Sequence, residues 1–221
     1  MVLKNRYIKD CNEFGIDEVG RGCLFGPVCV CAVYITEDID IPDNIKLRDS
    51  KKTTPKQREK IMDFVNDNPN IYYEYVFIDN NVIDDINILQ ATYKGMHKSI
   101  QKLSKKIKPD HLVIDGDKFK IYMDDEMDVI PHKCIPKGDD LYTHISLAAN
   151  IAKVKRDTYI INMCKNNPWL DEYYGLSGNK GYGTSKHMEG IRKFGITKYH
   201  RLSFKPCNQY DMCENEILFI H

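Results

Sequence analysis

The pattern of apolar and polar residues predicts a chain in which strands and helices alternate. Five runs fit strands: residues 14–20, 27–36, 71–79, 111–116 and 129–135. The second run is nearly all apolar and β-branched, which is typical of a buried strand. The third alternates and is rich in aromatic residues. Pro131 disfavours a central position for the last run, because proline cannot donate to a sheet ladder.

Helical spacing of apolar residues predicts four helices: residues 55–66, 84–106, 140–166 and 185–194. Thr54 is a suitable N-cap for the first, with Pro55 at its first position. Asp84 and Asp85 favour the start of the second, because acids stabilise a helix N-terminus. The third has a predicted buried face, formed by Leu141, Ile145, Ala148, Ala149, Ala152 and Ile160. Residues 117–128 and 171–184 are predicted to be irregular, the first acidic and the second rich in Gly and Tyr.

This order of elements predicts an α/β fold with a mixed sheet, in which an antiparallel pair comes first and an isolated strand later. The 221 residues are enough for one large domain, and we find no repeat, linker or low-complexity tract. One principal domain is therefore the simplest prediction.

Charge and cysteine content exclude several classes of protein. Acidic and basic residues balance at 32 each, so any nucleic-acid surface must be local. None of the eight cysteines forms a C-x-x-C pair, which disfavours a thiolate zinc site. A secreted disulfide framework is also disfavoured. The N-terminus lacks an apolar segment and no long apolar run follows, so we expect a cytoplasmic protein without a membrane span.

The first chemical signal is Asp17-Glu18, two adjacent acids in an apolar strand that leads into Gly20-Arg21-Gly22. Because side chains alternate between the faces of a strand, both acids cannot point outward. A buried carboxylate requires a compensating cation. That cation is either a metal ion or, in the structural alternative, Arg21 or a lysine.

Two further acidic signals lie at predicted element ends. Asp115 ends the strand 111–116, where ligands often bind in sheets covered by helices, although an aspartate before Gly116 also suits a turn. Asp139 and Asp140 precede a predicted helix, and one of them is a natural N-cap. Carboxylate-rich ligand sets select Mg²⁺ or Mn²⁺. Together these acids suit a two-metal phosphoryl-transfer site.

The motifs in combination resemble a known family, the type 2 ribonucleases H. They occur in family order over roughly residues 14–206: GIDEVGRG (15–22), GPV (26–28), RDSKK (48–52), NILQAT (87–92), VIDG (113–116), KGDD (137–140), AKVKRD (152–157), KGYGT (180–184) and HRLSF (200–204). The resemblance implies a ribonuclease-H-like fold with a central mixed sheet flanked by helices and a small C-terminal helical and loop part, about 168–206. It also implies a catalytic domain over 1–206 and leaves the tail 207–221 without a role.

The resemblance implies a metal-binding and catalytic set of four acids. Matched motif by motif, these are Asp17, Glu18, Asp115 and Asp139. Asp157 is the alternative candidate for the fourth acid. Asp140 is expected to cap the helix that follows. The implied cofactor is a divalent metal, Mn²⁺ or Mg²⁺.

The resemblance also implies nucleic-acid contacts. Gly20, Arg21 and Gly22 would read the 2′-hydroxyl of a ribonucleotide through the backbone, and Tyr182 would stack near the junction of ribose and deoxyribose. Lys51 and Lys52, with Arg48 nearby, form a local basic patch that either grips phosphate or is a solvated loop. Weaker phosphate candidates are Lys180, Arg201 and Lys205.

The predicted function is an endonuclease that hydrolyses the RNA strand of RNA–DNA hybrids and cuts 5′ of ribonucleotides embedded in duplex DNA. The products would carry 3′-hydroxyl and 5′-phosphate ends, and the enzyme is expected to act as a monomer. Two rivals stay open: another two-metal nuclease on the same fold, and a hybrid-binding module without activity. A small-molecule phosphohydrolase is more distant, since the chain has no P-loop.

Overall fold

The computed structural model describes residues 3–36, 38–47 and 53–213 of the chain. The chain divides into two compact units. The first, which we call the sheet unit, comprises Met1–Val19, Cys29–Phe77 and Tyr93–Val154. The second, the helical unit, comprises Gly20–Val28, Ile78–Thr92 and Lys155–His221. The predicted boundary between a catalytic domain and a tail at residue 206 stays a prediction.

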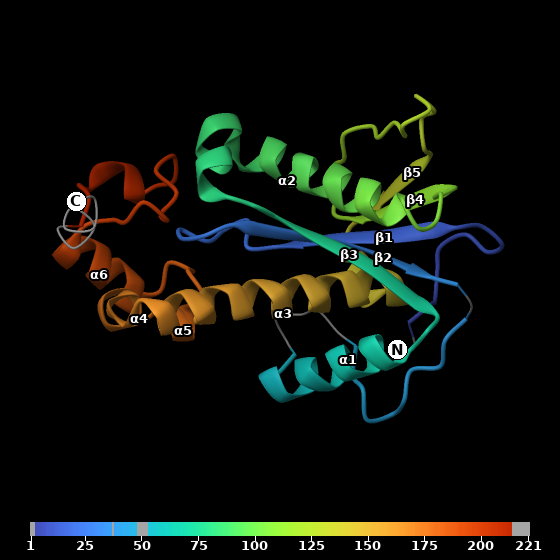
Figure 1. Cartoon of the computed structure of the whole chain (residues 1–221), viewed down its shortest axis with the longest axis horizontal. Helices are drawn as coiled ribbons and strands as arrows, with labels where there is room; N and C mark the ends of the chain where they lie inside the picture. The colour runs from blue at the N-terminus through green and yellow to red at the C-terminus, as the bar shows by residue number, and fades with distance from the viewer. Residues whose placement is uncertain (1–2, 37, 48–52, 214–221) are drawn as a thin grey trace. The chain divides into compact units, whose positions relative to one another are not determined.

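A five-stranded mixed sheet, with strand order β3-β2-β1-β4-β5, confirms the predicted fold class (Figure 1). Its strands are β1 (Glu13–Val19), β2 (Val28–Ile35), β3 (Ile71–Ile78), β4 (His111–Asp115) and β5 (His132–Ile135). β1 pairs antiparallel with β2, as predicted, and parallel with β4, which pairs parallel with β5. The later strand is therefore not isolated. β5 begins directly after Pro131 and lies at the sheet edge, where a proline is tolerated.

The described helices largely match the predicted ones. They are α1 (Pro55–Asp67), α2 (Asn80–Ser104), α3 (Thr143–Asn166), α4 (Pro168–Tyr174), α5 (Leu176–Asn179) and α6 (Ser185–Phe194), with 3₁₀ turns η1 (Gly138–Asp140) and η2 (Cys207–Gln209). The predicted cap of α1 is confirmed, because the Thr54 side chain accepts a hydrogen bond from the backbone N–H of Gln57. No helix among the described residues is both long and apolar enough to cross a membrane.

The predicted start of α2 at Asp84 is wrong, since the helix begins at Asn80. It is interrupted at Asn87, whose backbone has a φ of 67° and whose side chain accepts from the N–H groups of the next turn. Asp84 has a different role. Its carboxylate accepts hydrogen bonds from the backbone N–H groups of Leu202 and Ser203, each at 2.9 Å.

The predicted cap of α3 is also wrong. The chain forms the 3₁₀ turn η1 over Gly138–Asp140 and α3 begins only at Thr143, so Asp140 does not cap this helix. Leu141, assigned to the buried face, is 40% exposed, because it precedes the helix. The other predicted positions, including Ile145 and Ile160, are buried.

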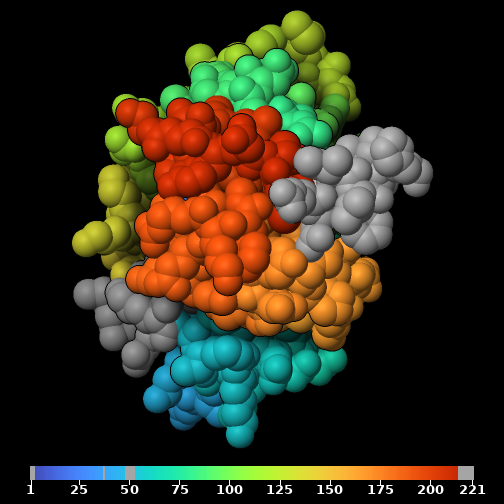
Figure 2. Space-filling model, turned by 90° about the vertical axis from the view of Figure 1, so that its left-hand side faces the viewer, coloured from blue at the N-terminus to red at the C-terminus, as the bar shows by residue number. Residues whose placement is uncertain are grey.

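Residues 171–184 are not an irregular loop, because they contain the end of α4 and all of α5. Gly175, with a φ of 65°, makes the left-handed turn between the two helices. Tyr174 is fully buried, as are Leu170 and Leu176. The tyrosines therefore belong to a core rather than to a solvated loop. Figure 2 shows the described residues of the helical unit after Lys155 as a continuous orange to red surface.

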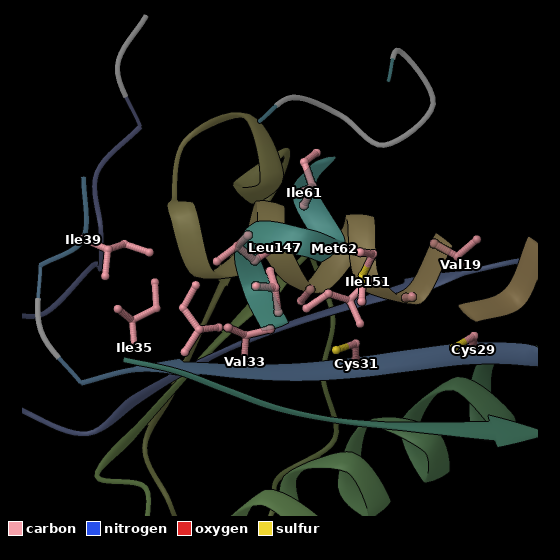
Figure 3. Close-up of a cluster of buried hydrophobic side chains, with 14 residues drawn as sticks. Val19, Cys29, Cys31, Val33, Ile35, Ile39, Ile61, Met62, Leu147 and Ile151 are labelled. Atoms are coloured by element: carbon pink, nitrogen blue, oxygen red, sulfur yellow. The ribbon is translucent and has the colours of Figure 1, made fainter. Parts of the chain in front are cut away.

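Both faces of the sheet are covered by helices of the sheet unit. On one face, β2 packs against α1 and the first half of α3, through residues such as Cys31, Ile61 and Leu147 (Figure 3). On the other face, Ile16 and Ile114 pack against the second half of α2. Cys29 and Cys31 are fully buried, and all eight cysteines are free thiols. This agrees with their predicted behaviour as small apolar side chains.

Candidate active site

Three of the four predicted acids lie on two neighbouring strands of the sheet unit, Asp17 and Glu18 on β1 and Asp115 at the end of β4. The register of β1 and β4 pairs Ile16 with Ile114, so Asp17 and Asp115 follow at equivalent positions on adjacent parallel strands. Glu18 is the next residue of β1. Parallel strands bring such residues to one edge of the sheet, where α/β proteins bind their ligands.

Asp139 reaches the same edge through the chain that follows β5. Asp115 pairs with Ile135, the last residue of that strand, and η1 begins three residues later. The backbone N–H of Gly138 donates a hydrogen bond to Asp115 Oδ1 over 2.7 Å. η1 is thereby tied to the end of β4, which places Asp139 next to this pair.

The charges of these acids act on one another. One of the two adjacent acids is buried, as predicted: it is Asp17, while Glu18, Asp115 and Asp139 are half-buried. Burial, followed by the charges of Glu18, Asp115 and Asp139, raises the pKa of Asp17 well above its usual range. A hydrogen bond from the backbone N–H of Glu18, at 2.6 Å, acts in the opposite direction. Acids in this arrangement are costly to keep ionised without added positive charge.

The donor set fits hard divalent cations. It consists of carboxylate oxygens alone, as Mg²⁺ and Mn²⁺ prefer. A different acidic group, Asp124, Glu126 and Asp128, has oxygens within 4.8 Å of one another. Lys108 already contacts that group, with ion pairs of 3.2 Å to Asp124 and 2.5 Å to Glu126. One of its three negative charges is therefore offset by a side chain.

The predicted glycine turn belongs to the helical unit, and two buried arginines hold it. Gly20 has a φ of 96°, and a Cβ placed there would collide with Nε of Arg156. The guanidinium of Arg201 donates to the carbonyl of Arg21 at 2.8 Å and to that of Gly26 at 3.0 Å. Arg201 is fully buried, so its assignment as a phosphate contact is wrong. Its function is to shape the turn.

Tyr182 lies beside the residue that follows this turn. Its side chain contacts Cys23, and burial together with this contact raises the pKa of its hydroxyl to about 12. The preceding residue, Gly181, accepts a hydrogen bond from the N–H of Leu24 at 2.8 Å. Arg156 links the same two loops, because it donates to the carbonyls of Phe25 and Lys180. The helical unit thus brings Tyr182 and the glycine turn together.

Two further predicted residues, Asp157 and Lys180, lie in the helical unit, and the charge of Asp157 acts on the Tyr182 hydroxyl. Asp157 is buried on α3 within the helical unit. The Lys180 ammonium donates to the carbonyl of Ser177. Arg48, Lys51 and Lys52 lie outside the described residues.

Sequence reasoning missed several buried polar residues. Glu13, at the start of β1, accepts hydrogen bonds from His111 at 3.1 Å and His144 at 2.9 Å. Gly15 could have indicated a close contact next to Glu13, because a strand glycine often marks such a contact. A Cβ at Gly15 would lie 2.7 Å from the His144 ring. It also missed the structural roles of Arg156 and His200, although both lie in motifs that were recognised.

Comparisons with known proteins identify the family of the chain. A family model described as Ribonuclease HII matches residues 14–207. The chain belongs to the ribonuclease HII family. It is 43% identical to a Ribonuclease HII from Cytophaga hutchinsonii over 196 residues. The aligned part covers 87% of this chain and 88% of that protein.

Solved structures similar to this chain confirm the fold. One is the ribonuclease H2 from Pyrococcus horikoshii OT3, with a TM-score of 0.66 and 24% identity over 90% of this chain and 96% of that one. Another is Bst-RNase HIII in complex with Mn²⁺, with a TM-score of 0.64 and 20% identity over 90% of this chain and 68% of that one. Family membership makes the chain a hydrolase, an endoribonuclease with divalent-metal-dependent ribonuclease H activity on RNA–DNA hybrids.

Proposed function

We propose that this protein cuts on the 5′ side of ribonucleotides in RNA–DNA hybrids and of single ribonucleotides embedded in duplex DNA. The products carry 3′-hydroxyl and 5′-phosphate ends. The observation that supports this most directly is the set of four carboxylates on β1, at the end of β4 and in η1. Such a set suits phosphodiester hydrolysis, because it can hold cations against the charge of a reacting phosphate.

In this proposal Asp17, Glu18, Asp115 and Asp139 hold two divalent ions. When bound, such ions activate a water molecule and stabilise the leaving oxygen. Asp17 is the most buried of the four, and its raised pKa reflects burial first and then the charges of the neighbouring acids, which bound cations would offset. The printed description of Bst-RNase HIII names Mn²⁺, and we propose Mn²⁺ or Mg²⁺ for this chain.

Selection of a ribonucleotide falls to the helical unit. The backbone of Gly20, Arg21 and Gly22 is proposed to contact the 2′-hydroxyl, which distinguishes RNA from DNA. Gly22 supports this role, because no atom lies within 4 Å of the position that a Cβ would occupy there. Tyr182, fixed beside Cys23, is proposed to stack on the adjoining sugar or base. Lys51 and Lys52 are proposed phosphate contacts.

The testing experiment uses a DNA duplex with one embedded ribonucleotide, end-labelled on the ribonucleotide strand. The protein is incubated with Mg²⁺, with Mn²⁺ or with chelator, beside an all-DNA duplex and a full RNA–DNA hybrid. We expect a metal-dependent cut immediately 5′ of the ribonucleotide and none in the all-DNA control.

Each rival predicts a different outcome. Another two-metal nuclease on this fold would cut substrates without a ribonucleotide. A hybrid-binding module would bind the duplex in chelator and yield no product in either metal. Cleavage of the hybrid alone, with the single ribonucleotide left intact, would confine the activity to longer RNA tracts and contradict the junction proposal.

A further inference from the structure

Two fully buried histidines of the helical unit face each other ring to ring. His187 lies on α6 and His200 lies in the segment that follows it. Their Nε2 atoms are 3.0 Å apart. The ring of Tyr174 packs edge-on against both. A buried pair of this kind requires each ring nitrogen to have a defined donor or acceptor role.

The surrounding backbone fixes the protons of both rings. The N–H of Thr197 donates to Nδ1 of His200 over 2.9 Å, so this nitrogen carries no proton. His200 must then be protonated on Nε2, and it donates to Nε2 of His187. The remaining proton of His187 is on Nδ1, which lies 3.0 Å from the carbonyl oxygen of Tyr182. One relay of hydrogen bonds therefore runs from Thr197 to Tyr182.

Burial favours the neutral forms that this relay requires. It lowers the pKa of His187, and it lowers that of His200 well below its usual range. The neighbouring imidazole lowers the pKa of His200 further. Both rings are therefore neutral at physiological pH.

The bond from His187 is not needed to satisfy the carbonyl of Tyr182. That oxygen already accepts from the N–H of Thr184 at 2.8 Å, and the N–H of Tyr182 donates to Asn179 at 3.0 Å. One hydrogen bond is enough to satisfy a buried carbonyl oxygen, so a second donor is not required. The second donor instead fixes the direction of the peptide from which the tyrosine side chain projects.

We propose that His187 is a positioning residue for Tyr182, and that His200 holds it in the tautomer that can act on this carbonyl. The pair keeps the Tyr182 ring oriented to receive the junction between ribose and deoxyribose. This inference rests on the proposed role of Tyr182 in nucleic-acid binding. Both histidines are fully buried, so their role is to position Tyr182 and not to touch the substrate.

Two substitutions at one position separate the two bonds of His187. In His187→Asn the amide N–H₂ takes the place of Nδ1 and can still donate to Tyr182. In His187→Gln the longer side chain reaches the place of Nε2, keeps the contact with His200 and loses the donor to Tyr182. Both replacements are polar, uncharged and smaller than histidine, so each is the control for the other.

The measurement is affinity for the single-ribonucleotide duplex in chelator, by fluorescence anisotropy, together with KM and kcat in metal. We expect His187→Gln to weaken binding and raise KM about tenfold, the effect of one directed hydrogen bond, with kcat nearly unchanged. His187→Asn should remain close to the wild type. Equal affinities for the two variants would overturn the inference.

A double-mutant cycle with Tyr182→Ala tests whether His187 acts through the tyrosine. In that background, His187→Gln should cause no further loss of affinity. An additive loss would mean that His187 acts elsewhere and would refute the proposal. Because binding is measured in chelator, weaker binding by the Gln variant supports the inference even if the wild type fails to cut and the proposed function is wrong.

Nitrogen-15 NMR of the imidazoles checks the relay in the unmodified protein, so the test does not depend on either variant folding. His187 should be protonated on Nδ1 and His200 on Nε2 at neutral pH. The opposite tautomer of His187 would remove its donor to Tyr182 and end the proposal.

Discussion

The backbone N–H of Gly138 donates a hydrogen bond to Oδ1 of Asp115 across 2.7 Å. Asp115, a predicted metal ligand, is thereby held by Gly138, the residue directly before the predicted ligand Asp139. The bond ties η1 to the end of β4 although the two segments are 23 residues apart in the chain. The geometry of the acid cluster therefore depends on a close approach of backbone to carboxylate at Gly138.

Replacement of Gly138 by alanine should disturb this approach. A Cβ would lie 2.7 Å from Cδ1 of Ile145, which is fully buried, and 3.5 Å from Asp115 Oδ1. We expect Gly138→Ala to cost about 1–3 kcal/mol of unfolding free energy through overpacking and to lower kcat by about tenfold or more. Chemical denaturation and steady-state cleavage measure the two effects. Gly178→Ala is the control, because a Cβ there meets no atom within 4 Å. Full activity of Gly138→Ala would contradict the proposed dependence.

The fourth acid can be assigned by three matched substitutions. We expect Asp139→Asn to lower kcat more than about 100-fold, since even the outer-shell partners of a metal contribute 10–100-fold. Asp140→Asn, at the adjacent position of η1, should change kcat less than about threefold. Duplex binding in chelator should be retained in both. If Asp157→Asn instead shows the large loss and Asp139→Asn keeps its activity, the fourth place belongs to Asp157.

Arg156 should be a major contributor to the stability of the helical unit. Its buried guanidinium donates to the carbonyls of Phe25, Pro27 and Lys180 at 2.7–2.9 Å. A lysine cannot reproduce three bonds in this fork, so Arg156→Lys leaves buried carbonyls without their donor. We expect a loss of about 3 kcal/mol in unfolding free energy, measured by denaturant titration. Arg192→Lys, at an exposed position of α6, should change stability by less than about 0.5 kcal/mol.

The sheet and the positions of the four acids could be predicted from the sequence because their signals are local. Strand periodicity marks β1 and β4, and Asp17 and Asp115 interrupt or end apolar runs. Asp17 and Asp115 lie close together because β1 and β4 pair in parallel. The strand pattern did not predict this pairing, since it placed β4 as an isolated strand. The family resemblance supplied that missing relation.

The errors arose where contacts distant in sequence decide local structure. Asp84 was read as a helix start, but its carboxylate binds backbone N–H groups more than 100 residues away. Tyr174 was placed in a loop because glycines and tyrosines surround it, yet its ring fills the core of the helical unit. Arg201 was read as a surface cation, and only the fold reveals the carbonyls that surround it.

Glu13 forms a buried polar network at the opposite end of β1 from the acids. Besides His111 and His144, its carboxylate accepts from the backbone N–H groups of Tyr7 and Ile8, at 2.5 and 3.0 Å. Burial alone would raise the pKa of Glu13, but the hydrogen bonds from the two histidines outweigh it and lower the pKa to about 2. Burial also lowers the pKa of His144, which stays neutral and donates through Nε2, because the N–H of Ile145 donates to its Nδ1.

This network should make the protein sensitive to acid. The Glu13 pKa falls from 4.5 to about 2 on folding, so its contribution is fully present above pH 4.5 and is lost as the pH falls toward 2. The lowered pKa of His144 acts in the same direction, since below pH 6.5 the unfolded chain takes up a proton that the folded chain resists. We expect Glu13→Gln to lose about 2 kcal/mol at pH 7, after allowance for solvent screening, and to show a flatter decline between pH 4.5 and 2. Denaturant titrations across this range measure both effects.

Glu74→Gln, which removes a surface ion pair with Lys106, is the control and should leave the pH profile nearly unchanged. Parallel profiles for the wild type and Glu13→Gln would show that Glu13 keeps an ordinary pKa in the folded protein.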